Sequence, residues 1–131
     1  METYRLPEDR LRNLGVGLVY LFGSQAQGTD TPLSDVDIGV VFTAPEVLAN
    51  SLDLHTKLYD LLTDVIPGSR EVDVVFLQQT SPEFQFHVIR TGQVIFESDP
   101  IFRADYEERV VNEYLDFEPV LREFSAALLA R

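Results

Sequence analysis

Hydrophobic residues along the chain occur in two patterns, which predict an alternation of strands and helices. Short apolar runs bounded by glycine, proline or polar residues predict strands over residues 17–22, 34–42, 71–77 and 93–97. Apolar residues at every third or fourth position predict helices over residues 7–13, from 43 to Pro67-Gly68, from 80 to Gly92, and from Asp99-Pro100 onward. This alternation indicates an α/β or α+β fold, with a mixed sheet of about four strands packed with helices and a C-terminal helical segment.

Two of the helix starts carry a capping signal. Thr43 and Thr80 are each followed by a glutamate three positions later, and a proline in each segment strengthens the pattern. In the last helix, Pro119 is expected to kink or split the helix, because proline cannot donate the backbone hydrogen bond that a helix interior needs.

The last predicted helix also carries an apolar stripe along its whole length. Its members recur every three or four residues: Phe102, Tyr106, Val110, Tyr114, Phe117, Leu121, Phe124 and Leu128. Packing against the sheet explains the start of the stripe. Because the stripe is longer than one small sheet can cover, its end is a candidate surface for a partner.

Composition limits the classes of protein that the chain can represent. A length of 131 residues with 45% hydrophobic residues predicts a single domain over 1–131. Ten Lys and Arg against 22 Asp and Glu give a net charge of −12, which repels a phosphate backbone, so direct nucleic-acid binding is not expected. The chain has no cysteine, which excludes disulfides and thiolate metal sites and fits a cytoplasmic protein. No apolar run approaches the ~20 residues of a membrane span, and the N-terminus lacks an apolar signal core.

The candidate chemistry begins in residues 23–37, which read GSQAQGTDTPLSDVD. Gly23 follows an apolar strand and permits a sharp turn. If a short helix begins at Ser24, its free N–H groups and the Ser24 hydroxyl face the tip of the strand, where a phosphate would be held.

Three aspartates belong to the same predicted site. Asp35 and Asp37 alternate with apolar residues in the second strand and therefore share one face, and Asp73 lies between valines in the third strand. Converging carboxylates repel one another and need a cation. Mg²⁺ is the natural one, because it accepts carboxylate oxygens and leaves positions for water and phosphate. Two such ions ~3.5–4 Å apart would stabilise an in-line phosphoryl displacement.

Each of these features has an ordinary structural interpretation when it is taken alone. Gly-Ser is usually a turn, Asp-x-Asp is commonly a solvated strand edge, and Asp73 fits a solubilising strand end. His55 and His87 are interpreted as packing or surface residues, because no second histidine or cysteine lies at ligand spacing.

Together the features resemble the nucleotidyltransferase superfamily of DNA polymerase beta. The shared pattern is Gly-Ser, ten residues, Asp-x-Asp and a later Asp in a hydrophobic strand, and it covers roughly residues 15–97. The resemblance implies that Asp35 and Asp37 hold Mg²⁺, that Asp73 completes a second metal site, and that Gly23 and Ser24 hold the triphosphate of ATP. The size resembles the minimal nucleotidyltransferase (MNT) branch, which is often encoded as the antitoxin of a HEPN-domain ribonuclease toxin. This branch transfers AMP from ATP to a toxin tyrosine, so the resemblance implies the same role and a HEPN-type partner here.

One departure from the family pattern keeps alternatives open. Many relatives have GSxARG at the turn, whereas Gln27 stands here at the arginine position and donates a hydrogen bond without carrying a charge. One alternative is a small-molecule nucleotidyltransferase of the aminoglycoside-modifying type, although the chain has little room for the extra domain of such relatives. The other is a non-catalytic antitoxin that neutralises its toxin by covering it. Homo- and hetero-oligomers are both compatible with the sequence.

Overall fold

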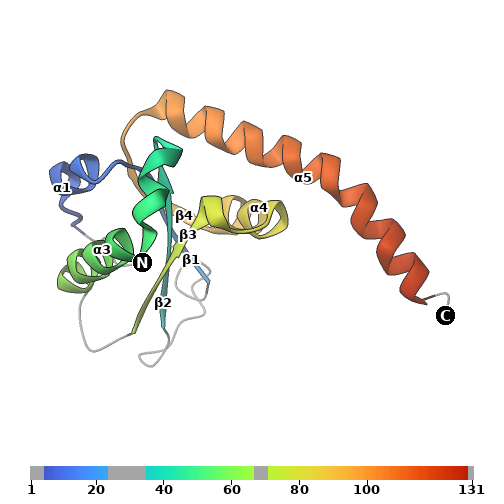
Figure 1. Cartoon of the computed structure of the whole chain (residues 1–131), viewed down its shortest axis with the longest axis horizontal. Helices are drawn as coiled ribbons and strands as arrows, with labels where there is room; N and C mark the ends of the chain where they lie inside the picture. The colour runs from blue at the N-terminus through green and yellow to red at the C-terminus, as the bar shows by residue number, and fades with distance from the viewer. Residues whose placement is uncertain (1–4, 24–34, 67–70, 130–131) are drawn as a thin grey trace.

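The computed structural model describes residues 5–23, 35–66 and 71–129, and its centre is a four-stranded mixed sheet (Figure 1). The strands are β1 (Val16–Phe22), β2 (Val36–Phe42), β3 (Val72–Phe76) and β4 (Gln93–Glu97). Their order in the sheet is β3-β2-β1-β4. β1 is antiparallel to β2 and β4, and β2 is parallel to β3. All four predicted strands are confirmed, with boundaries within two residues of those expected.

Helices cover both faces of the sheet, and their bounds are α1 (Glu8–Asn13), the 3-10 helix η1 (Pro45–Asn50), α3 (Ser51–Val65), the 3-10 helix η2 (Leu77–Gln79), α4 (Pro82–Thr91) and α5 (Pro100–Leu129). α1 and α3 lie on one face, and α4 and the start of α5 lie on the other (Figure 1). The mixed α/β architecture predicted from the sequence is therefore confirmed. No helix in the described ranges is long and apolar enough to cross a membrane.

The central strand β1 divides the interior into two cores. All seven of its residues are buried, because both faces of this strand are covered by helices. Val19 and Leu21 pack in the core under α1 and α3, and Leu18 and Tyr20 pack in the core under α4 and α5. This alternation follows from the two-residue period of a strand, and β2 continues it with Val36, Ile38, Val40 and Phe42 in the first core.

The capping signal predicted from the sequence forms a cap at the start of α4 but not after Thr43. The Ser81 hydroxyl accepts the Phe84 N–H at 3.1 Å, so the capping predicted for α4 comes from the residue after Thr80. The Thr43 prediction is wrong, because its N–H and hydroxyl both donate to the Gly15 carbonyl, at 2.9 and 3.3 Å. The end of the strand thus uses the hydrogen bonds that a cap would need, and the chain enters a 3-10 turn before α3.

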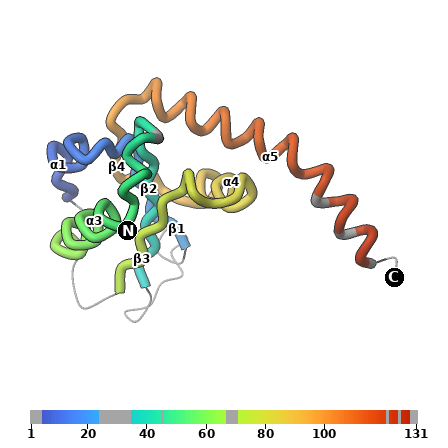
Figure 2. The backbone as a smooth tube through the Cα atoms, in the orientation of Figure 1, coloured from blue at the N-terminus to red at the C-terminus, as the bar shows by residue number. Residues whose placement is uncertain are grey.

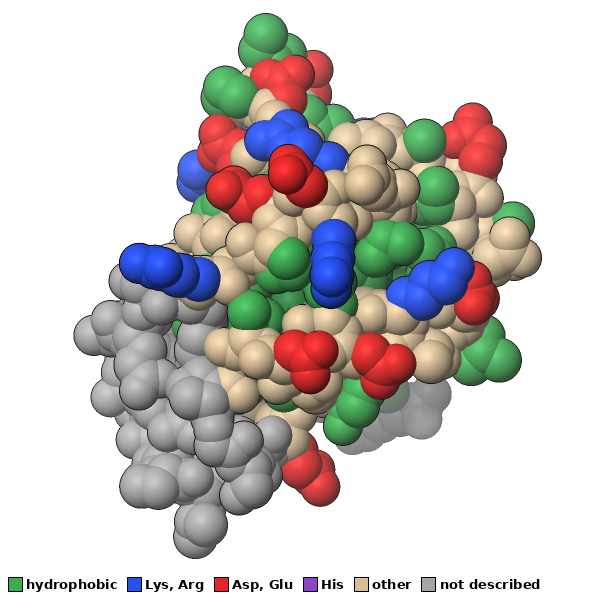
Figure 3. All heavy atoms as spheres, turned by 90° about the vertical axis from the view of Figure 1, so that its left-hand side faces the viewer, with side chains coloured by type: hydrophobic (Ala, Val, Ile, Leu, Met, Phe, Trp, Pro, Cys, Tyr) green, Lys and Arg blue, Asp and Glu red, His purple; other side chains and the backbone are tan. Residues whose placement is uncertain are grey.

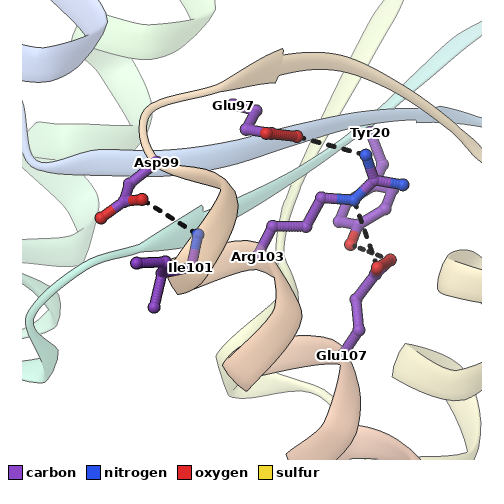
Figure 4. A network of polar contacts seen from close by, with 6 residues as sticks. All are labelled: Tyr20, Glu97, Asp99, Ile101, Arg103 and Glu107. Atoms are coloured by element: carbon purple, nitrogen blue, oxygen red, sulfur yellow. Dashed lines mark hydrogen bonds and ion pairs between the residues drawn. The ribbon is translucent and has the colours of Figure 1, made fainter.

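Figure 4 shows a polar network that fixes the start of α5 to the sheet. The buried Tyr20 hydroxyl of β1 donates to Glu107 at 2.9 Å, and Arg103 contacts both Glu107 and Glu97 at 3.2 Å. Burial and the Glu107 carboxylate raise the pKa of Tyr20, which keeps the hydroxyl protonated as the donor. The network therefore joins α5 to β1 and β4.

α5 extends far beyond the body of the molecule (Figures 1 and 2). At ~1.5 Å per residue its 30 residues span ~45 Å. Tyr106 and Val110 are buried against the sheet, and Tyr114 stacks on Phe86 with ring centroids 4.0 Å apart. The apolar residues that follow are exposed: Leu115, Phe117, Val120, Phe124 and Leu128. Pro119 lies inside the helix without splitting it.

The side of the molecule with α1 and α3 carries acidic, basic and apolar side chains on its surface. In the space-filling view of this side, acidic and basic side chains border a central apolar area (Figure 3). Among exposed apolar side chains of α3, Leu52 is the most accessible, with 82% of its surface in solvent.

Candidate active site

The candidate site lies at the end of the sheet where β2 and β3 begin. Asp37 and Asp73 are direct partners in the parallel register of the two strands. Register partners on adjacent strands point to the same face, so the two carboxylates lie side by side. Asp37 is half-buried and Asp73 is exposed. The convergence predicted for these two aspartates is therefore present.

Gly23, at the end of β1, borders the site on the other side of Asp37. Phe22 is the register partner of Asp37, and Gly23 follows it with a φ of +75°, in the left-handed region that favours glycine. A Cβ atom built on Gly23 would overlap the Asp37 carboxylate oxygen Oδ2 and would lie 3.3 Å from its carboxyl carbon. The absence of a side chain thus lets the backbone turn directly against Asp37.

The three aspartates form one electrostatic group. The pKa of Asp37 is raised above its ordinary value, first by burial and then by repulsion from Asp73 and Asp35. Asp35 is exposed and directly precedes β2. A group of this kind holds unfavourable negative charge unless a cation or a proton compensates it.

The chemistry of this donor set fits Mg²⁺ completed by substrate. Within the described ranges, no three acidic, histidine or cysteine side chains are close enough to hold a metal by themselves. Mg²⁺ does not require such a cage, because it commonly binds one or two carboxylates and takes its other ligands from water and phosphate oxygens. The paired carboxylates of Asp37 and Asp73, with Asp35 beside them, supply that partial set.

The remaining predicted residues are distributed as follows. Ser24 and Gln27 lie outside the described residues. His55 and His87 are surface residues, as predicted, and neither belongs to the carboxylate group. His55 instead places Nε2 2.9 Å from the Val74 carbonyl oxygen. Sequence reasoning missed this contact and the direct packing of Gly23 on Asp37, since both depend on which strands become neighbours.

The raised pKa of Asp37 predicts how the stability of the metal-free protein changes with pH. The folded state binds the Asp37 proton more tightly than the unfolded state does, so protonation of Asp37 stabilises the fold. This stabilisation is fully present below about pH 4 and is lost as the pH rises from there through the raised pKa. Thermal unfolding of wild type and Asp37→Asn should show a Tm difference that grows in favour of the variant over this range. Added Mg²⁺ should narrow the difference. A difference that shrinks with rising pH would show that Asp37 is not under repulsive strain.

Comparison with known proteins gives a family match and structural neighbours. The family model for "Polymerase beta, Nucleotidyltransferase" matches residues 9–101. A search of curated proteins finds no match. The structure resembles a chain from a toxin–antitoxin complex with AMP-PNP, with 22% identity, a TM-score of 0.67, and coverage of 95% of this chain and 99% of that chain.

Two further neighbours have the same character. One is from an MntA–HpeT toxin–antitoxin mutant with two aspartate-to-glutamate changes two positions apart, with 19% identity, a TM-score of 0.62, and coverage of 95% and 99% of the two chains. The other is from the complex of a tri-AMPylated Shewanella oneidensis HEPN toxin with an MNT antitoxin, with 18% identity, a TM-score of 0.60, and coverage of 93% and 95%. At these identities the likeness shows a shared fold along nearly the whole of each chain.

Proposed function

Because this chain belongs to the polymerase beta nucleotidyltransferase family, we propose that it is an antitoxin that transfers AMP from ATP to a tyrosine of a HEPN-type toxin. The observation that carries this proposal is the register pair of Asp37 and Asp73, with Gly23 packed against it and Asp35 adding to its charge. A carboxylate group in which Asp35 and Asp73 are exposed suits phosphoryl transfer to a large acceptor, which brings its own surface to the site.

Each residue of the site has a defined task in this proposal. Asp35 and Asp37 would hold Mg²⁺, and Asp73 would complete the site of a second ion. Bound Mg²⁺ neutralises charge on the phosphates of ATP. The Gly23 backbone, together with the Ser24 hydroxyl, would hold the triphosphate. The site residues thereby align the α-phosphorus with the attacking hydroxyl.

The proposed reaction is a substitution at the α-phosphorus of ATP. The tyrosine oxygen forms a bond to this phosphorus, and the bond from the phosphorus to the bridging oxygen breaks to release pyrophosphate. Asp73, which is exposed, would accept the proton that the tyrosine hydroxyl loses. The products are an AMP–tyrosine ester and pyrophosphate.

Two observations support a HEPN-type toxin as the partner. One structural neighbour comes from a complex of an AMPylated HEPN toxin with an MNT antitoxin. The chain also has a net charge of −12 and an exposed apolar stripe at the end of α5, which suit a basic partner that buries the stripe. The same stripe favours a second candidate function, in which the chain neutralises its partner by covering it without catalysis.

Labelled ATP tests the proposed activity. Incubated with Mg²⁺ and a co-purified HEPN-type toxin, the chain should transfer label from the α-phosphate to the toxin and release pyrophosphate, and EDTA should stop the transfer. Absence of label on the toxin under these conditions would exclude the activity. Aminoglycoside resistance in cells that express the chain alone would identify a small-molecule acceptor instead.

Gly23→Ala should slow transfer by about tenfold to 100-fold, because the new methyl group displaces the Asp37 carboxylate and small misplacements of reacting groups carry costs of this size. Gly15→Ala is the matched control. Gly15 has a φ of +83°, so the backbone strain is similar, but its Cβ would meet Val47 Cγ1 at an ordinary 3.4 Å. Equal rates for the two variants, measured with labelled ATP, would show that Gly23 acts only through backbone strain.

A further inference from the structure

The outer edge of the sheet at β3 is a surface beside the carboxylate group. β3 is an edge strand and pairs with β2. The Val36 N–H donates to the Glu71 carbonyl at 2.8 Å, so this position of the β3 segment faces β2. Because backbone direction alternates along a strand, Val75 also directs its N–H and C=O toward β2. Val74 and Phe76 direct theirs to the outer edge.

α3 packs on a face of the sheet, and its first turns border this outer edge and leave a groove there. His55 of α3 places Nε2 2.9 Å from the Val74 carbonyl oxygen, and its ring lies 5.6 Å from that of Phe76. The groove has a volume of about 440 Å³ and runs between the first turns of α3, β3 and the residues after η2. Leu52 and Thr80 are among its lining residues. Apolar side chains and the outward backbone groups of β3 therefore border the same groove.

The exposed face of α3 continues from this groove toward the carboxylate group. Leu52, His55 and Tyr59 are spaced by three and four residues and so share one helix face. Leu52 is 82% exposed and Tyr59 is 41% exposed. α3 ends at Val65, and the chain then enters β3 at its Asp73 end, so Tyr59 lies nearer that end than Leu52 does.

We propose that this surface, the β3 edge (Leu52, His55 and Tyr59 of α3 with Val74 and Phe76 of β3), binds an extended cationic segment of the acceptor polypeptide by strand addition. Because His55 contacts the Val74 carbonyl, the outward groups that hydrogen-bond the segment are the Val74 N–H and the N–H and C=O of Phe76. The groove accepts alternate side chains of the segment. The segment then leads its hydroxyl residue to Asp73. This inference rests on the proposed transfer to a protein.

Charge determines the kind of segment that fits. Apart from Asp73, which is assigned to a metal site, residues 51–66 and 71–76 contain four acids and Lys57 as their one base, so their net charge is 1 − 4 = −3. A segment rich in Lys or Arg complements this charge, whereas an acidic segment is repelled. A second copy of this chain would bring the same negative charge to the edge and is disfavoured as the occupant.

Amide hydrogen exchange tests strand addition directly, without relying on activity. The chain alone and its complex with the co-purified HEPN-type toxin are compared residue by residue by NMR after quenching. Exchange at Val74 and Phe76 should slow at least about tenfold in the complex, while Val75, already directed at β2, should change little. Unchanged exchange at Val74 and Phe76 in the complex would overturn the inference. Protection that appears in the chain alone as its concentration rises would assign the edge to a second copy.

A charge substitution tests the same surface during turnover. Leu52→Arg should raise the KM for the acceptor about tenfold, because the new positive charge repels a cationic segment. The kcat should change little, because Leu52 lies outside the carboxylate group. Ile101→Arg is the matched control, since Ile101 is 69% exposed on the first turn of α5, outside the groove.

The outcomes separate the two proposals. Equal KM values for Leu52→Arg and wild type, when wild type transfers AMP, would remove the β3 edge and leave the activity standing. No transfer by wild type would remove the activity, and the exchange pattern at Val74 and Phe76 would then decide the β3 edge by itself.

Discussion

Replacing Asp35 and Asp37 together by asparagine should lower the rate of AMP transfer by about 1000-fold or more, which corresponds to about 4 kcal/mol of transition-state stabilisation. Asparagine keeps the size of each side chain but removes the negative charge that would hold Mg²⁺. The fold should persist, because the substitution relieves the repulsion that raises the pKa of Asp37. The measurement is incorporation of labelled ATP into the toxin, together with circular dichroism and Tm.

The matched control for this variant is the double substitution Glu8→Gln and Asp9→Asn. These residues are exposed on α1, outside both proposed sites, and change the net charge of the chain by the same amount. Transfer by the control should stay near the wild-type rate. If the Asp35 and Asp37 variant labels the toxin as well as wild type does, these carboxylates do not hold the catalytic ions.

Deleting Val120–Arg131 should weaken toxin binding by about 100-fold while leaving the body of the protein folded. Phe124 is 64% exposed, and apolar side chains of this kind contribute ~1.5–3 kcal/mol each when an interface buries them fully. A 100-fold loss corresponds to about 2.7 kcal/mol, so burial of one or two such side chains accounts for it. The measurement is Kd by titration calorimetry, with Tm as the test of folding.

Point variants separate loss of the stripe from loss of helix length. Phe124→Glu should weaken binding in the full-length helix, whereas Ile101→Glu places the same charge on the exposed first turn of α5 and should have little effect. A truncated chain that stays folded and binds with an unchanged Kd would show that the end of α5 is not a contact. The interface would then lie near the carboxylate group.

The strands could be predicted because their signals are local. The apolar run that forms β1 and the alternation in β2 each specify a strand and the face on which its side chains lie. The shared face of Asp35 and Asp37 stays a prediction, because Asp35 lies just before the first residue of β2. The stripe of the last helix could also be predicted, and the structure shows buried Tyr106 and Val110 near its start and exposed Phe117, Phe124 and Leu128 toward its end.

Features that depend on strand order could not be predicted from the sequence. The convergence of Asp37 and Asp73 was expected, but their direct register pairing requires β2 and β3 to be parallel neighbours. The packing of Gly23 on Asp37 requires β1 on the other side of β2. Thr43 shows the same limit, because its hydrogen bonds to the Gly15 carbonyl replace the cap that its local sequence favours. Long-range contacts override local propensity at these positions.

The intact mass of a HEPN-type toxin co-expressed with this chain tests catalytic neutralisation most directly. With the wild-type chain, the toxin should carry one or more added AMP units. With the chain in which Asp35 and Asp37 are replaced by asparagine, the toxin should keep its unmodified mass. An unmodified toxin held in a tight complex with the wild-type chain would contradict catalytic transfer and would identify neutralisation by binding alone.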